Sequence, residues 1–120
     1  MTATPPEESL RTALVAADAA EDKLASDVAV LHVGPVVGVC EYFVLATAAN
    51  ERQVKAVVDA VEDRIAAQLD DRPRSVEGAD GRRWVLLDYG DVVVHVFLAE
   101  ERDYYRLERL YSDAAVVDRS

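Results

Sequence analysis

The sequence predicts an α/β fold in which one mixed β-sheet of about five strands packs against flanking helices. Two segments repeat apolar residues at three- and four-residue spacing, which is typical of amphipathic helices. Between and after them lie short runs of Val, Leu and aromatic residues bounded by turn residues, which is typical of strands. The 120 residues, 51% of them hydrophobic, are enough for one core. We therefore expect a single domain over 1–120, with an ordered part at about 10–115.

The first helix is predicted from Pro6 to about Ser26, after a short acidic N-terminal segment. Proline is tolerated in the first turn of a helix, and Glu7 and Glu8 interact favourably with the positive end of the helix dipole. The apolar stripe predicted for this helix consists of Leu10, Ala13, Leu14, Ala17 and Leu24. This stripe is expected to face the sheet.

Two strands are predicted next. The run at 28–33 is apolar at every position except His32, as expected for a strand covered on both faces. Gly34 and Pro35 end it with turn chemistry, and a bend is expected at 38–41. The second strand is predicted at 42–46.

A second helix of roughly twenty residues is predicted after Asn50. Asn50 is a good N-cap, and Gln53 three residues later completes a capping box. The buried stripe of this helix is expected to be Val54, Val57, Val58, Val61, Ile65 and Leu69. The Asp- and Pro-containing segment at 71–73 is expected to end it.

The last third of the chain predicts a hairpin. A short edge strand at 74–77 and a turn at 78–81 precede two strongly apolar runs at 83–88 and 92–98. Three residues centred on Gly90 separate the two runs, so we expect an antiparallel pair joined by a tight connection.

A short final helix is expected around Tyr104 to Tyr111, followed by an extended arm at 112–120. The aromatic residues of this last third are more typical of protein-interface anchors than of base-stacking residues, because the basic residues of the chain are scattered and opposed by acidic neighbours.

The net charge of −10 is the wrong sign for direct binding to a phosphate backbone, so little nucleic-acid contact is expected. An acidic surface suits a basic protein partner, although it also serves solubility alone. The single cysteine, Cys40, excludes an internal disulfide and a multi-cysteine zinc site. No apolar run has membrane-spanning length and no signal-like segment is present, so a cytoplasmic protein is expected.

One carboxylate–imidazole grouping has spacing compatible with chemistry: Asp88, Asp91 and His95. On a hairpin these residues could bind a metal or move protons, as in a metal- or nucleotide-dependent small hydrolase or transferase. The alternative is that the aspartates shape the turn and His95 is hydrogen-bonded on a strand. Because no further ligand or nucleophile is evident, we predict no enzyme, no cofactor and no metal. His32 and Cys40 are not proposed as a site.

Six segments, taken in order and spacing, resemble the Iojap family of ribosomal silencing factors. They are Tyr42–Thr47, Asn50–Val54, Glu77–Gly78, Trp84–Asp88, Gly90–His95 and Tyr105–Leu110. The resemblance implies a fold similar to nucleotidyltransferase domains without their catalytic apparatus. It also implies binding to large-subunit ribosomal protein fourteen, a block on joining of the two ribosomal subunits, and lower translation in nutrient limitation or stationary phase.

The chain departs from that family at three places. Thr47 to Asn50 replaces a glycine-containing turn, Glu41 stands where the family usually has Asp, and Tyr111 replaces a Trp. The lack of glycine in the turn also weighs against a phosphate-binding loop. We expect the aromatic Tyr111 to preserve the docking surface.

The predicted partner-binding surface lies around the hairpin and the last helix. Trp84 and Tyr105 are its candidate apolar anchors, and His95 is expected to orient neighbouring groups. The candidate acidic contacts are Glu77, Asp88, Asp91 and Glu108. Off the ribosome, a homodimer formed through an open sheet edge is a further expectation.

Overall fold

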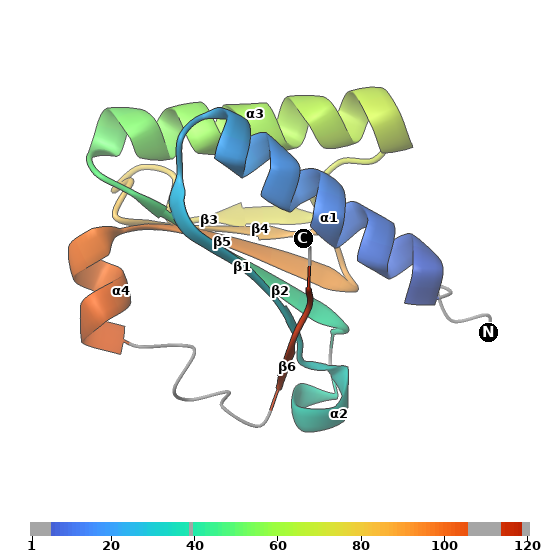
Figure 1. Ribbon diagram of the computed structural model, residues 1–120. Helices are drawn as coiled ribbons and strands as arrows, with labels where there is room; N and C mark the ends of the chain where they lie inside the picture. Colours follow the sequence, from blue (N-terminus) through green and yellow to red (C-terminus); the bar gives the residue numbers. More distant parts are fainter. Residues whose placement is uncertain (1–5, 39, 106–113, 119–120) are drawn as a thin grey trace.

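The computed structural model describes residues 6–38, 40–105 and 114–118; at residues 6, 36–37 and 103–105 it describes the backbone alone. These residues form one six-stranded mixed sheet with two long helices on one face (Figure 1). The elements are α1 (Pro6–Asp22), β1 (Ser26–His32), α2 (Gly34–Val37), β2 (Tyr42–Ala48), α3 (Glu51–Leu69), β3 (Ser75–Glu77), β4 (Trp84–Asp88), β5 (Val92–Leu98), α4 (Ala99–Tyr105) and β6 (Ala115–Val116). The predicted fold class is confirmed.

The strand order is β3-β4-β5-β2-β1-β6. Only the central pair, β2 and β5, is parallel; the other neighbouring strands are antiparallel. A parallel pair needs a long crossover connection, and the segment between β2 and β5 supplies it with α3, β3 and β4. The central strand β2 is buried at all seven residues because it is covered on both faces.

Helices α1 and α3 pack side by side on the face that we call the helical face (Figure 1). Five alanines of α1 are completely buried, and their small side chains allow the two helices to approach closely. Valines and Ile65 of α3 fill the space above the sheet, as the predicted stripe required. The buried alanines of α1 are Ala13, Ala16, Ala17, Ala19 and Ala20.

The predicted first helix is too long at its end. It stops at Asp22, and Leu24 lies beyond it with φ of 63° and a side chain that is 83% exposed. The reason is tertiary: the Gln53 side-chain amide donates hydrogen bonds to the carbonyls of Lys23 and Leu24 at 3.0 Å each. These bonds fix a turn where apolar periodicity alone predicts more helix.

The predicted turn and bend between the first two strands contain one turn of helix, α2, which Gly38 ends in a left-handed conformation. Pro35 lies in the first turn of α2, where its missing N–H does no harm. The second strand begins at Tyr42 as predicted and continues to Ala48.

The start of α3 has the predicted capping box. The Asn50 side chain accepts a hydrogen bond from the Gln53 N–H at 2.8 Å. The Gln53 carbonyl oxygen in turn accepts one from the Ala49 N–H at 2.7 Å. The helix ends at Leu69, and Asp70 is left-handed with φ of 52°.

The β4–β5 hairpin is confirmed, with the Tyr89 N–H bonded to the Val92 carbonyl at 2.9 Å and Gly90 at φ of 91°. Helix α4 begins at Ala99, five residues before the predicted start, while most of the predicted range lies outside the described residues. Within the predicted arm, residues 115–116 pair with β1 as β6, so the described sheet has six strands rather than about five.

Candidate protein-docking face

The sheet face opposite α1 and α3 carries the candidate site, and we call it the second face. Because side chains alternate along a strand, Trp84, Leu86 and Asp88 of β4 share this face with their partners on β5. The β5 partners are Phe97, His95 and Val93, in that order. Phe43 and Leu45 of β2, together with Leu31 of β1, belong to the same apolar cluster on this side of the sheet, but their side chains are buried.

Helix α4 covers the end of the second face where β2 and β5 terminate. Its Arg102 is only 8% exposed, and the guanidinium lies 5.6 Å from the centre of the Phe97 ring. Arg102 also donates to the Thr47 hydroxyl at 2.8 Å and to the Asp27 carbonyl. Thr47, predicted to lie in the turn after the second strand, is part of β2, and its hydroxyl helps to hold α4.

Trp84 and His95 form the polar contact at the centre of the second face. The Trp84 indole Nε1–H donates to His95 Nδ1 at 3.1 Å. Indole is only a donor, so Nδ1 must be the acceptor and neutral His95 carries its proton on Nε2. The Phe43 ring stands edge-on to His95, with ring centres 4.8 Å apart. Trp84 itself is partly exposed.

Burial determines the charge of His95. The residue is 5% exposed, and desolvation lowers the pKa of its imidazole to about 4. His95 Nε2 has no hydrogen-bond partner among the described residues. A neutral imidazole accepts the Trp84 indole N–H and so holds that side chain, while the role predicted for His95 in partner binding stays a prediction.

Glu77 and Asp88 flank this surface at the β3 side of the sheet. Glu77 is exposed and pairs with Leu86, which in turn pairs with His95, so the three lie in one row across the sheet. Asp88 is partly exposed, and its carboxylate accepts a hydrogen bond from the Gly90 N–H at 2.7 Å. Asp88 therefore shapes the hairpin and also leaves a negative charge beside the second face.

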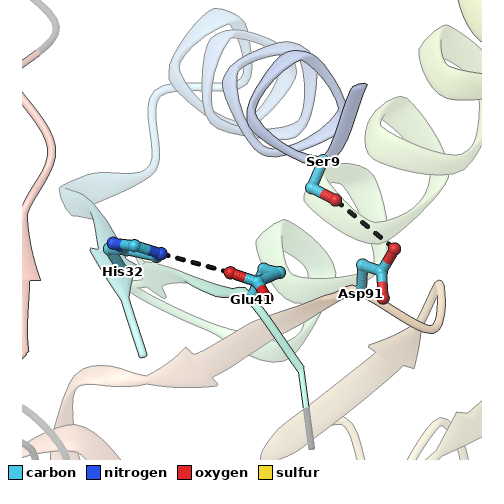
Figure 2. A network of polar contacts seen from close by, with 4 residues as sticks. All are labelled: Ser9, His32, Glu41 and Asp91. Carbon is cyan, nitrogen blue, oxygen red and sulfur yellow. Dashed lines mark hydrogen bonds and ion pairs between the residues drawn. The ribbon is translucent and has the colours of Figure 1, made fainter. Parts of the chain in front are cut away.

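Asp91 faces the helical side instead. The Ser9 hydroxyl of α1 donates to the Asp91 carboxylate at 3.4 Å (Figure 2). The Asp91 backbone carbonyl accepts hydrogen bonds from Glu41 and Tyr42 at 2.7 and 3.0 Å, which join the starts of β5 and β2. The prediction that Asp91 belongs to the same surface as Trp84 is not supported by this orientation.

The structure also does not bring together the three residues of the alternative site, Asp88, Asp91 and His95. Asp88 and His95 share the second face, but Asp88 pairs with Val93, two residues before His95 on β5. The His95 ring lies against the Phe43 ring. Asp91 points toward Ser9 on the other side. Within the part of the chain that the structure describes, no three His, Cys, Asp or Glu side chains are grouped as metal ligands.

The sequence did not reveal the pairing of His32 with Glu41. His32 Nε2 lies 3.2 Å from the Glu41 carboxylate (Figure 2). The His32 ring also stacks on Tyr42, with ring centres 4.9 Å apart. A Cβ on Gly34 would lie 2.6 Å from this carboxylate, so glycine makes room for the pair. The pair joins two chain segments that come together only through the β1–β2 register, which composition cannot give.

Cys40 is buried near three carboxylates, and burial followed by the charges of Asp88, Glu41 and Asp91 raises its thiol pKa to about 11. The thiol therefore stays protonated at neutral pH and lacks the thiolate character of a reactive cysteine. The structure pairs His32 with Glu41 rather than with Cys40.

Three residues of the predicted surface fall wholly or partly outside the described residues. Glu108 and Tyr111 lie outside the described residues, and only the backbone of Tyr105 is described, at the end of α4. No described helix is long and apolar enough to cross a membrane.

The fold and the second face define a small mixed α/β domain with a partly exposed tryptophan held by a buried histidine. The family model described as "Ribosomal silencing factor during starvation" matches residues 6–120. The chain therefore belongs to the ribosomal silencing factor family, the family that the six sequence segments resemble.

Individual relatives agree with this assignment. The chain is 40% identical over 104 residues to "Ribosomal silencing factor RsfS" of Bacillus subtilis, covering 87% of each protein. It is 36% identical over 113 residues to the chloroplastic protein Iojap of Arabidopsis thaliana, covering 92% of this chain and 46% of that protein. A crystal structure of a Chromobacterium violaceum protein superposes with a TM-score of 0.81 at 33% identity, covering 86% of this chain and 85% of that one.

Proposed function

We propose that this protein silences ribosomes by binding the large ribosomal subunit and sterically preventing the small subunit from joining. In this proposal it contacts large-subunit ribosomal protein fourteen, works in the cytoplasm under nutrient limitation or stationary phase, and needs no catalytic step or cofactor. Membership of the ribosomal silencing factor family supports the role in translation. The binding partner and the steric mechanism are our proposal.

The observation that carries the docking proposal is the Trp84–His95 pair on the second face. Large aromatic residues held in one rotamer bind with little loss of side-chain entropy and are enriched in interface hot spots. Trp84 is partly exposed and its indole is fixed by His95 at 3.1 Å. Glu77 and Asp88 beside it supply negative charge toward a basic ribosomal protein.

We place Trp84, Glu77 and Asp88 in this interface, with the buried His95 behind them as the residue that orients Trp84. Tyr105 and Glu108 remain predicted contacts, on sequence alone. Asp91 lies on the other side of the hairpin, and we place it at the margin. An interface of about 800 Å² per partner is enough for stable binding.

Co-sedimentation with separated large and small ribosomal subunits tests the proposal. We expect the protein to sediment with large subunits only, and those subunits then to fail to join small ones. Absence of the protein from the large-subunit fraction at micromolar concentration would refute the proposal.

Variants then test the docking face. Trp84→Ala should weaken large-subunit binding by at least about 2 kcal/mol, because it removes a central anchor. Leu24→Ala is the matched control, since Leu24 is an exposed apolar residue away from the second face. If folded Trp84→Ala protein binds as tightly as wild type, the second face is not the docking surface.

Charge reversal gives a second matched pair. Glu77→Lys should weaken binding to a basic partner, whereas Asp63→Lys, on an exposed site of α3, makes the same charge change on the helical face. Equal effects of both variants would indicate a general charge effect rather than contact through the second face.

Self-association off the ribosome stays a prediction. The two edge strands, β3 and β6, are three and two residues long in the described structure, and short edges resist edge-to-edge pairing. Sedimentation equilibrium of the free protein at increasing concentration tests for a dimer.

A further inference from the structure

Arg102 is a buried charged residue that has no role in the docking proposal. It belongs to α4, which lies on the side of the sheet opposite α1 and α3 (Figure 1). Its side chain is 8% exposed, so it offers a partner very little surface. Burying a guanidinium is costly unless its hydrogen bonds are made inside the protein, and the groups around Arg102 make them.

Two strands are shaped to receive the Arg102 guanidinium. On β1, Asp27 is left-handed with φ of 48° and lies where the register with β2 shifts, between Ser26 and Ala29. Such a bulge re-aims the backbone, and the Asp27 carbonyl here accepts a hydrogen bond from Arg102 Nη1. On β2, the buried Thr47 hydroxyl accepts one from the same nitrogen at 2.8 Å. One nitrogen of Arg102 therefore joins α4 to both strands.

The same guanidinium packs on a ring that also contacts Trp84. Arg102 Cζ lies 5.6 Å from the centre of the Phe97 ring, within the range of a cation–π contact. Phe97 is completely buried, and its ring centre lies 5.5 Å from that of Trp84, its partner across the β4–β5 pair. Arg102 and Trp84 thus share one buried neighbour, although they belong to different elements.

The Trp84 indole has two supports of different kinds. His95 accepts its N–H at 3.1 Å, which fixes the position of one atom of the ring. The Phe97 ring packs against the indole with an angle of 40° between the two planes. Because aromatic contacts have preferred geometries, this second contact sets the plane of the indole. The orientation of Trp84 therefore depends on a fixed Phe97.

We propose that Arg102 is a positioning residue for the docking face. It ties α4 to β1 and β2 and packs on Phe97, and so keeps the Trp84 indole in the orientation that the partner meets. Arg102 acts through Phe97 and does not itself contact the partner. This inference rests on the proposed function, because it takes Trp84 as the anchor.

The indole of Trp84 reports on this role directly, since Trp84 is the only tryptophan of the chain. Arg102→Met keeps an unbranched side chain and removes the charge. We expect it to lower the heteronuclear NOE of the indole N–H in the free protein, because the ring becomes more mobile. Large-subunit binding should weaken about fivefold, because the complex must then order the indole. An unchanged NOE, or unchanged binding by a variant whose NOE falls, would overturn the proposal.

Arg64→Met is the matched control for a general loss of stability. Arg64 also bonds to another element, since it donates to the Asp22 carboxylate, but this pair joins α3 to the end of α1. We expect Arg64→Met to leave the indole NOE unchanged and to alter large-subunit binding by less than about twofold. Equal effects of Arg64→Met and Arg102→Met would show that the indole responds only to lower stability, and would overturn the proposal.

Conservative variants test the bonds of Arg102 without removing its bulk. Because one nitrogen donates both bonds, the single ammonium group of Arg102→Lys can replace it. We expect Arg102→Lys to keep most of the NOE and of the affinity that Arg102→Met loses. Thr47→Val removes the hydroxyl at similar volume and should lower both, whereas Thr47→Ser should keep both. Equal NOE values for Thr47→Val and Thr47→Ser would contradict the contact through Thr47.

The positioning inference and the docking proposal fail in different measurements. If the wild-type protein does not bind large subunits, the docking proposal is wrong. The NOE values of the free variants still decide whether Arg102 holds Trp84, because no ribosome takes part in that measurement.

Discussion

His95 combines two properties at the scale of a single residue: it is buried, and it accepts a hydrogen bond from Trp84. Its folded-state pKa of about 4 lies below the ordinary value of 6.5, so the unfolded chain takes up a proton at higher pH than the folded protein. Acidification between pH 6.5 and 4 therefore favours unfolding, by up to about 3 kcal/mol from this group.

The variant His95→Asn isolates this effect, because an amide oxygen can still accept the indole N–H but does not titrate. Urea unfolding at pH 7, 5.5 and 4 should show wild type losing up to about 3 kcal/mol more stability than the variant. Equal losses of unfolding free energy in wild type and variant would contradict a buried, neutral His95.

Gly78 is a second residue whose environment allows little change. Its φ is 80°, and a Cβ there would lie 2.1 Å from the Trp84 carbonyl oxygen. We expect Gly78→Ala to cost about 2–4 kcal/mol of unfolding free energy, because both the backbone and the contact are unfavourable. Gly81→Ala is the control, since a Cβ at Gly81 meets nothing within 4 Å. Similar denaturation midpoints for the two variants would contradict the close approach at Gly78.

At the scale of elements, α3 is the best-predicted helix, and its capping residues do more than the sequence indicates. Asn50→Ala should cost about 1 kcal/mol through loss of the N-cap. Gln53→Ala should cost more, because Gln53 completes the capping box and also holds the turn at Lys23 and Leu24. Thermal unfolding of both variants measures which one loses more stability. An equal or smaller loss for Gln53→Ala would show that its bonds to the turn at Lys23 and Leu24 add no stability.

Elements with a long apolar period are predictable from the sequence, and elements fixed by distant partners are not. The apolar periods of α3, β4 and β5 are long and unambiguous, so these elements are confirmed nearly at their boundaries. The end of α1 and the pairing of β6 depend on partners far along the chain, which local patterns do not contain.

In the candidate site, too, strand pairing is predictable from the sequence and tertiary contacts are not. The predicted hairpin puts Trp84 and His95 on neighbouring strands, and their hydrogen bond follows from the β4–β5 register. The direction of Asp91 depends on how α1 crosses the hairpin, and the His32–Glu41 pair depends on the β1–β2 register. Both are tertiary outcomes, and neither has a signature in composition or spacing.

At the scale of the whole molecule, the net charge of −10 sets the approach to a basic partner. Complementary charges accelerate encounter, and salt screens them, with a Debye length of about 10 Å at 0.1 M. We expect the association rate with large subunits to fall severalfold between 50 and 300 mM salt, while dissociation changes little. Stopped-flow fluorescence of a labelled protein measures both rates, and a salt-independent association rate would argue against electrostatic steering.

The position of β5 between β4 and β2 has a consequence for folding during synthesis. Strands β1 and β2 are synthesised early and β3 and β4 later, yet each of these pairs contacts the other only through β5. A nascent chain that has not reached Leu98 thus holds two half-sheets with nothing between them, each with an unsatisfied edge. We therefore expect the complete sheet to close only after that strand has been translated and inserted between β4 and β2.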